Sequence, residues 1–252
     1  MGALTVVYVL AAVLVTAGIS GTLGMAGGLI LMGALAFVMP AAAALALHGL
    51  VQLGSNGWRA LIHRRHIRWP VVGVYAVGAL LAMGLFSLVA FTPSKLAIYL
   101  ALGLLPVLVW LPERWLNLDA SRPPQAFAAG VASTALSLTA GVSGPFNDLF
   151  FVRTPMTRHE VVSTKACVQV FGHLAKVVFY GAALVKLSGP GAPPLWLAVA
   201  ALPLSMLGAM LGALVLEKMS DAGFRTLRRW LVTAVGLVYL AQAVSLMLPR
   251  SP

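Results

Sequence analysis

Two segments of the chain carry the same pattern of polar side chains inside apolar surroundings, 117 residues apart. In each segment the polar residues follow one another at steps of four, four and three, so they lie along one face of an α-helix. The two stripes are His48, Gln52, Asn56, Arg59 and Lys165, Gln169, His173, Lys176. Burying an ionisable group at the centre of a bilayer costs roughly 2.5–3.5 kcal/mol, so it usually faces a partner or a watered cavity. The stripes therefore predict a polar site at membrane depth.

The same offset relates two glycine-rich turns, TLGMAGG at 22–28 and TAGVSGP at 139–145. Irregular backbone at membrane depth is tolerated only against protein or a watered cavity. The short helix that follows each turn presents unpaired N–H groups and the positive end of its dipole, which together favour an anion. Helix packing is the alternative, because Gly24 and Gly28 also form a small-xxx-small contact motif. The repetition of the turns at a fixed offset favours the binding interpretation.

These patterns give a set of candidate site residues. The predicted substrate-binding residues are Gly24, Gly27, Gly28, Gln52, Gly141, Ser143, Gly144, Phe146, Asn147, Lys165 and Gln169. His48, His173 and Asp148 are candidates for proton coupling, since a histidine titrates near neutral pH. Among the deep ionisable residues Asp148 is the only acid, and this balance favours an anionic substrate.

Three of the charged residues have two interpretations each. Asp148 either takes part in coupling or pairs structurally with Lys165. Arg59 and Lys176 either line the pathway or extend to the membrane surface, as long cationic side chains near span ends do. Spacing alone leaves these alternatives open.

Composition assigns the chain to the membrane proteins. It is 60% hydrophobic and 9% charged, whereas soluble domains carry roughly 25% charged residues. The net charge of +11 sits mostly in short loops, which is typical of membrane orientation and not of a nucleic-acid surface. The single cysteine excludes an internal disulfide. The HRRHIR segment at 63–68 is interpreted as an orientation signal, and neither a metal site nor a cofactor is expected.

The chain divides into two equivalent halves, 1–111 and 125–252, joined by a polar linker at 112–124 within one compact bundle. Residues 1–20 lack the basic start of a secretory signal and are expected to remain as a mature membrane segment. The predicted spans are 3–20, 29–39, 41–62, 70–91, 94–111, 125–138, 146–155, 158–184, 194–216 and 224–248.

The distribution of lysine and arginine predicts the topology. If each broken segment dips in and returns to its starting side, the loops on one side carry 11 of these residues and those on the other side carry 3. If each broken segment crosses once, the loops divide 7 against 7. The positive-inside rule favours the first arrangement, with both termini in the periplasm. Three crossings in each half also make the two repeats inverted.

The predicted fold is therefore an all-α integral membrane protein of two inverted repeats, each with a glycine-broken re-entrant hairpin and three transmembrane helices. An intramembrane enzyme is disfavoured, because HExxH, GxSxG and paired intramembrane carboxylates are missing from the sequence. A metal-ion transporter is disfavoured by the single deep acid and single cysteine. A non-transporting membrane subunit, with its stripes buried against a partner, remains a rival. A homodimer is left open.

The chain resembles the sulfite exporter TauE/SafE family of bacterial membrane permeases. The matching stretches are GTLGMAGGLILMGALAFVMP at 21–40, the segment 48–69 ending in HRRHIRW, and TAGVSGPFNDLFF at 139–151. The resemblance implies transport of small sulfur-containing anions, such as sulfite, sulfoacetate or other organosulfonates, across the inner membrane. The family contains exporters and importers, and export is the expected direction. The first turn reads GMAGG where a glycine-richer run is expected, so another small organic or inorganic anion is the alternative substrate.

Overall fold

The computed structural model describes residues 1–23, 26–89, 93–112, 118–151, 154–186, 193–216, 218–219 and 221–248. Within these ranges the regular elements are all helices, and no β-strand is present. In chain order they are α1 (Ala3–Leu23), α2 (Ala26–Val38), α3 (Ala41–Ile62), the 3₁₀ helix η1 (Arg64–His66), α4 (Trp69–Ser87), α5 (Lys95–Leu104), α6 (Pro106–Trp110), α7 (Pro123–Thr139), α8 (Gly144–Phe151), α9 (Arg158–Tyr180), α10 (Ala182–Lys186), α11 (Leu195–Leu216) and α12 (Asp221–Met247).

The helices follow the predicted spans closely, with two differences. The predicted span 94–111 is divided into α5 and α6, because Pro106 lacks the N–H that would continue the helix. The predicted span 158–184 ends as α9 at Tyr180, and the short α10 follows Gly181. Among the described residues, α1, α4, α11 and α12 each contain a stretch long and apolar enough to cross a membrane. The long helices α3 and α9 are the two that carry the polar stripes.

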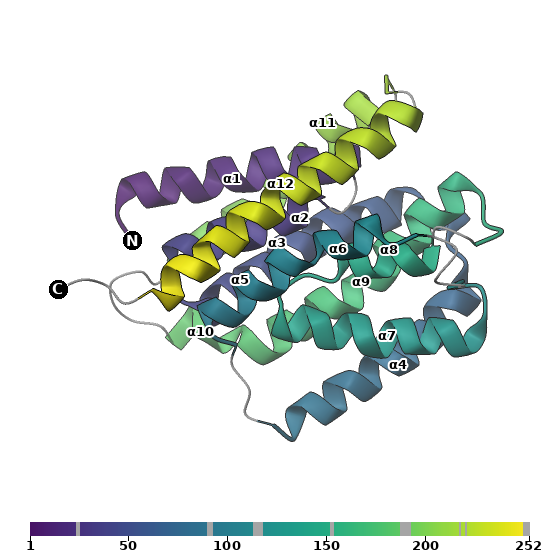
Figure 1. The fold of residues 1–252 in the computed structure, drawn as a ribbon, viewed down its shortest axis with the longest axis horizontal. Helices are drawn as coiled ribbons and strands as arrows, with labels where there is room; N and C mark the ends of the chain where they lie inside the picture. The colour runs from purple at the N-terminus through teal and green to yellow at the C-terminus, as the bar shows by residue number, and fades with distance from the viewer. Residues whose placement is uncertain are drawn as a thin grey trace.

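The two stripe helices pack against each other in the middle of the bundle (Figure 1). On one side of them α1 packs against α11, and on the other side α7 packs against α4. In the order of helices, α7 and α11 come at the places in the predicted second half that α1 and α4 take in the predicted first half. Each of these pairs therefore joins one helix from each predicted half. In addition α5 and α12, also at equivalent places, pack against each other.

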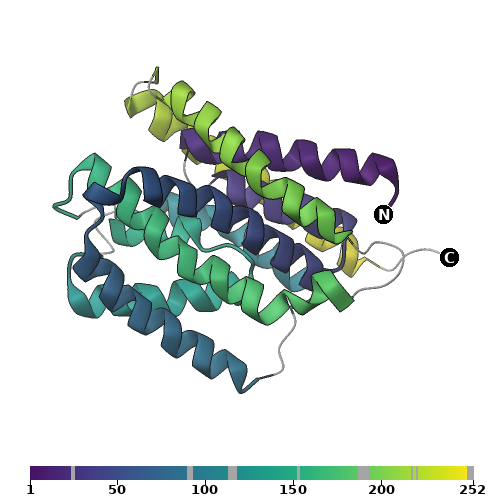
Figure 2. The same ribbon diagram turned by 180° about the vertical axis from the view of Figure 1, so that it is seen from behind.

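The chain ends and the basic connections lie at opposite ends of the bundle. The start of α1 and the end of α12 lie together at one end (Figure 2). The junction between α3 and α4, the start of α7, the end of α11 and the start of α12 lie at the other end in both views. The segment before α7 and the end of α8 also lie together, because the Ala120 N–H donates to the Phe150 carbonyl at 2.7 Å.

The outer helix pairs approach closely through glycine. A Cβ atom on Gly212 of α11 would lie 2.1 Å from the carbonyl oxygen of Gly18 in α1. In the other pair, a Cβ atom on Gly130 of α7 would lie 2.1 Å from the carbonyl oxygen of Tyr75 in α4. Within lipid, helices associate by van der Waals packing, so small residues at the contact allow the backbones to meet. The α1–α11 pair and the α4–α7 pair, one on each side of the stripe helices, therefore both pack closely through glycine.

We expect Gly130→Ala to lower the thermal stability of the detergent-solubilised protein, because the added methyl group overlaps the backbone of α4. Such overpacking costs about 1–3 kcal/mol. The matched control is Gly84→Ala, on an exposed site of α4 where a Cβ meets nothing within 4 Å. The control is expected to keep or raise the melting temperature, since alanine favours a helix over glycine. Equal melting temperatures for the two variants would contradict the close packing of α4 on α7.

Candidate functional site

A small polar cavity lies between the stripe helices α3 and α9 and the two glycine turns. Its volume is about 10 Å³, which is room for about one water molecule. Its lining combines polar side chains from both stripes with backbone from the starts of α2 and α8. The residues are Gly28, His48, Gln52, Asn56, Arg59, Val142, Ser143, Gly144, Gln169 and His173.

The first glycine turn contributes Gly28 to the lining. A Cβ atom on Gly28 would lie 2.4 Å from Nε2 of Gln52, so the missing side chain lets the stripe approach the start of α2. Gly27 is buried against α1, where a Cβ atom would lie 1.9 Å from the carbonyl oxygen of Thr16. It therefore serves helix packing and does not line the cavity. The predicted site residue Gly24 lies outside the described residues.

The second glycine turn brings the two halves into contact. Gly141 has a φ of +79°, a left-handed conformation that favours glycine. A Cβ atom there would lie 2.6 Å from Sδ of Met32 in the first half. Ser143 and Gly144 then reach the cavity. The hydroxyl groups of Ser143 and Ser137 are hydrogen-bonded at 3.0 Å, which holds the turn against α7.

The two stripes bond to each other at equivalent positions. Nδ2 of Asn56 lies 3.0 Å from Nε2 of His173, and these residues are 117 positions apart. Because Oδ1 of Asn56 accepts from the guanidinium of Arg59, the amide NH₂ donates to Nε2 of His173. The proton of a neutral His173 is then on Nδ1, which is buried and has no hydrogen-bond partner among the described residues. An unsatisfied donor of this kind indicates room for a ligand or water.

Two cations lie beside the cavity, one fully enclosed and one partly buried. Lys176 has no exposed surface, and its ammonium contacts Nδ1 of His48 at 2.5 Å and the carbonyl oxygen of Gly141 at 2.7 Å. Arg59 lines the cavity and donates to the Ser20 carbonyl at 3.3 Å, while its Nε has no partner in the described part of the chain. Neither cation forms a salt bridge to a carboxylate of the described residues. Both side chains therefore point into the bundle.

The other deep cation has an acidic partner. The ammonium of Lys165 pairs with Asp148, which joins α9 to α8 within the second half. Neither residue is part of the cavity lining. Of the two interpretations open for Asp148, the structural pair is the one seen here.

The remaining candidates in α8 face other contacts. Asn147 is fully buried, and its Oδ1 accepts from Ser133 at 2.7 Å and from Tyr75 at 3.3 Å. Phe146 packs against Phe150, with ring centroids 5.4 Å apart. Tyr75 and Ser133 were missed by the sequence analysis, because a single polar residue in an apolar helix gives no pattern. Val142 of the lining was missed for a similar reason, since it adds no polar group.

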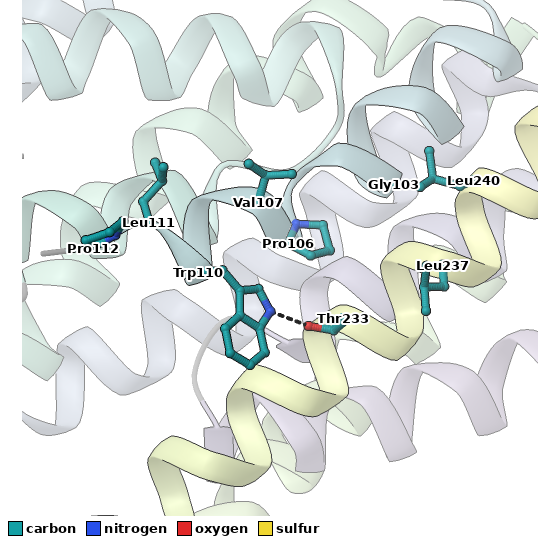
Figure 3. Close-up of a pocket in the computed structure, with 9 residues that line it drawn as sticks. All are labelled: Gly103, Pro106, Val107, Trp110, Leu111, Pro112, Thr233, Leu237 and Leu240. Atoms are coloured by element: carbon teal, nitrogen blue, oxygen red, sulfur yellow. Dashed lines mark hydrogen bonds between the residues drawn. The ribbon is translucent and has the colours of Figure 1, made fainter. Parts of the chain in front are cut away.

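A second and larger hollow lies on the outside of the bundle, between α5, α6 and α12 (Figure 3). Its volume is about 480 Å³, and apolar side chains dominate its lining. The indole N–H of Trp110 donates to the hydroxyl of Thr233 at 2.8 Å. The hollow contains none of the predicted site residues, and no charged side chain is among the described residues that line it. It therefore lacks the groups that an ion site needs.

The central cavity has the chemistry of an anion site. Side-chain amides of Gln52 and Gln169, the hydroxyl of Ser143 and the guanidinium of Arg59 surround it. No Asp or Glu is among the described residues of its lining. Hydrogen bonds from charged donors to an oxyanion are shorter and stronger than neutral ones. A compact anion with several acceptor oxygens matches this set of donors.

We expect Gly141→Ala to destabilise the protein, because a left-handed conformation costs an L-residue about 1–2 kcal/mol and the new methyl group meets Met32. The measurement is thermal unfolding in detergent. Gly57→Ala in α3 is the control, since a Cβ at that position meets nothing within 4 Å. A Gly141→Ala variant as stable as the control would show that the turn does not require glycine.

Comparison with known proteins agrees with this chemistry. The family model described as sulfite exporter TauE/SafE matches residues 8–239. No curated protein and no solved structure matches the chain. The family model covers both halves, both stripes and both glycine turns. The chain therefore belongs to the sulfite exporter TauE/SafE family of membrane transporters.

Proposed function

We propose that this protein is a secondary transporter that moves small sulfur-containing anions, such as sulfite, sulfoacetate or other organosulfonates, across the bacterial inner membrane by alternating access. The observation that carries the proposal is the central cavity, which both stripes line with hydrogen-bond donors and Arg59, with Lys176 buried next to it. A site of this composition repels cations and lowers the free energy of an anion in a low-dielectric surrounding.

The exchange of helix partners supports an inverted repeat. In such an arrangement a pseudo-two-fold axis in the membrane plane relates the halves, and residues near the axis contact their own equivalents. The contact between Asn56 and His173 is of this kind, as are the α3–α9 and α5–α12 pairs. The two hairpins, α1–α2 and α7–α8, are then the re-entrant segments whose turns meet at the site.

The positions of the chain ends support the predicted topology. The start of α1 and the end of α12 lie opposite the α3–α4 connection and the start of α12. The α3–α4 connection carries Arg64, Arg65 and Arg68, and the first turns of α12 carry Arg225, Arg228 and Arg229. By the positive-inside rule the basic end is cytoplasmic, so both termini are periplasmic. Export of the anion then begins from the basic end of the bundle.

Coupling to protons is the proposed driving force. His48 and His173 line the cavity, with ring centroids 5.8 Å apart. A proton taken up by either histidine adds positive charge next to the bound anion, and its release removes that charge. Asp148, the third candidate, pairs structurally with Lys165 outside the lining, so the two histidines are the proposed coupling residues.

Alternating access requires the cavity to widen before the substrate binds. Room for about one water molecule is too little for a sulfur oxyanion, so the turns and the stripes separate when the substrate enters. The rival function, a non-transporting subunit, needs both stripes sealed by protein. The unsatisfied Nδ1 of His173 and Nε of Arg59 favour transport over that alternative.

We expect the double variant Gln52→Ala, Gln169→Ala to lose sulfite flux by at least about tenfold, because it removes one amide donor from each half of the site. The measurement is uptake or release of radiolabelled sulfite by proteoliposomes at matched protein content.

Gln242→Ala in α12 is the matched control, since it removes an amide that does not line the cavity, and its flux is expected to equal that of the wild type. Flux retained in the double variant would reject the proposed site. If the protein transported other small anions but neither sulfite nor organosulfonates, the proposed substrate class would be wrong.

A further inference from the structure

A chain of three hydrogen bonds connects the two glycine turns through the middle of the protein. Nε2 of His48 lies 2.9 Å from the carbonyl oxygen of Gly28, at the start of α2. Nδ1 of the same ring lies 2.5 Å from the ammonium of Lys176, which lies 2.7 Å from the carbonyl oxygen of Gly141. This series of hydrogen bonds therefore links α2, α3, α9 and the turn before α8. Two of these four elements belong to each half.

The direction of each bond follows from the groups involved. A carbonyl oxygen only accepts, so Nε2 of His48 donates to Gly28 and carries the ring proton. Nδ1 is then a bare lone pair that accepts from the ammonium of Lys176. An ammonium group has three donors, and the described residues offer acceptors to two of them. All three hydrogen bonds form when His48 is neutral and Lys176 is charged. The third N–H donor of the Lys176 ammonium has no acceptor among the described residues.

The connection occurs in only one of the two equivalent places. Position 165 is equivalent to His48, but Lys165 pairs with Asp148 inside its own half. Position 59 is equivalent to Lys176, but Arg59 bonds to Asn56 and to the Ser20 carbonyl inside its own half. Two cations, Lys165 and Arg59, cannot bond to each other as His48 and Lys176 do. The hydrogen-bonded connection between the two glycine turns is therefore made by His48 and Lys176 and is not repeated by Lys165 and Arg59.

The connection also holds the cavity small. Gly28 is part of the lining, and Gly141 directly precedes the lining residues Val142 to Gly144. An anion larger than a water molecule can enter only if these walls move apart, which breaks the bonds between His48, Lys176 and Gly141. The ammonium of Lys176 has two neutral partners and no carboxylate among the described residues. An anion offers it the stronger, charge-assisted bond, and its flexible four-carbon stem lets it turn toward the anion.

We infer that His48 and Lys176 form a latch that holds the two glycine turns together beside the cavity, and that an entering anion opens the latch by taking over the ammonium of Lys176. The role of the anion rests on the proposed function, whereas the latch itself rests on the hydrogen bonds alone. Lys176 thus binds the anion directly, and its charge connects substrate binding to the separation of the two halves.

The latch is tested by the rate at which a thiol at the cavity wall is alkylated. Cys167, the single cysteine of the chain, is replaced by serine, and Val142→Cys is the reporter because Val142 lines the cavity and is only 4% exposed. The reagent is N-ethylmaleimide, which is uncharged. Removing a nearby cation raises the pKa of a thiol and slows its alkylation, so a faster reaction after loss of Lys176 reports opening and not activation of the thiol.

We expect Lys176→Met in this background to raise the labelling rate at least about tenfold without added anion, since the hydrogen bonds that hold the turns together are lost. Lys218→Met removes a charge from an exposed site and is expected to leave the rate unchanged. Lys176→Arg keeps the charge and the donors and is expected to label within about threefold of the reporter background. An unchanged rate in Lys176→Met, or an equal rise in Lys218→Met, would overturn the latch.

Folding of Lys176→Met is judged by monodisperse elution in detergent. If this variant does not fold, a second variant tests the latch. His48→Phe keeps an aromatic ring but removes both nitrogens, so it breaks the connection and leaves Lys176 in place. It is expected to raise the labelling rate of Val142→Cys in the same way. A rate equal to that of the reporter background would count against the latch as strongly as the first result.

The role of the anion is tested by flux in proteoliposomes, with the native Val142 and Cys167. We expect Lys176→Met to raise the KM for sulfite at least about tenfold, because the cation that binds the anion is missing. A purely structural defect would lower the maximal flux at an unchanged KM. An unchanged KM would overturn the role of the anion. A wild type that moves no sulfite would overturn the proposed function together with that role, while the labelling rates still judge the latch.

Discussion

Positive charge buried without a carboxylate is the constraint on which the site depends. Lys176 is fully enclosed, and its partners are a carbonyl oxygen and an imidazole nitrogen. Arg59 is satisfied in part by a carbonyl and an amide oxygen. A buried charge is costly unless it is paired and hydrogen-bonded, and neutral acceptors compensate only part of that cost. In the proposed mechanism, these incompletely compensated charges favour the binding of an anion.

The way the halves meet explains why the equivalent residues differ. A residue that contacts its own equivalent needs a partner of complementary character, and Asn56 against His173 provides a donor facing an acceptor. The next level of the stripes has diverged further, with His48 and Lys176 bonded across the halves and Lys165 and Arg59 bonded within them. Two copies of one sequence would place identical groups face to face. The hydrogen bonds between α3 and α9 are thus made by unlike side chains.

Much of the architecture could be predicted from the sequence, because the evidence for it is periodic. The steps along each stripe identified α3 and α9, and seven predicted residues line one cavity: Gly28, His48, Gln52, Ser143, Gly144, Gln169 and His173. The partners of the cations could not be predicted. For Lys176 the spacing left two interpretations open, lining the pathway or extending to the membrane surface. The packing of α3 against α9 and the turn at Gly141 enclose it instead, and these contacts join residues far apart in the chain.

The small volume of the cavity determines how the buried charges contribute to the proposed mechanism. A ligand shifts a conformational equilibrium only by the difference in its affinity for the two states. A preformed site of full size would bind the anion without favouring any movement. Here the walls meet around a volume of about 10 Å³. In the proposed mechanism they must separate before the anion binds, so that binding favours the separated state. A cation held by neutral groups suits this purpose better than a salt bridge, because an anion can displace an imidazole and a carbonyl far more readily than a carboxylate.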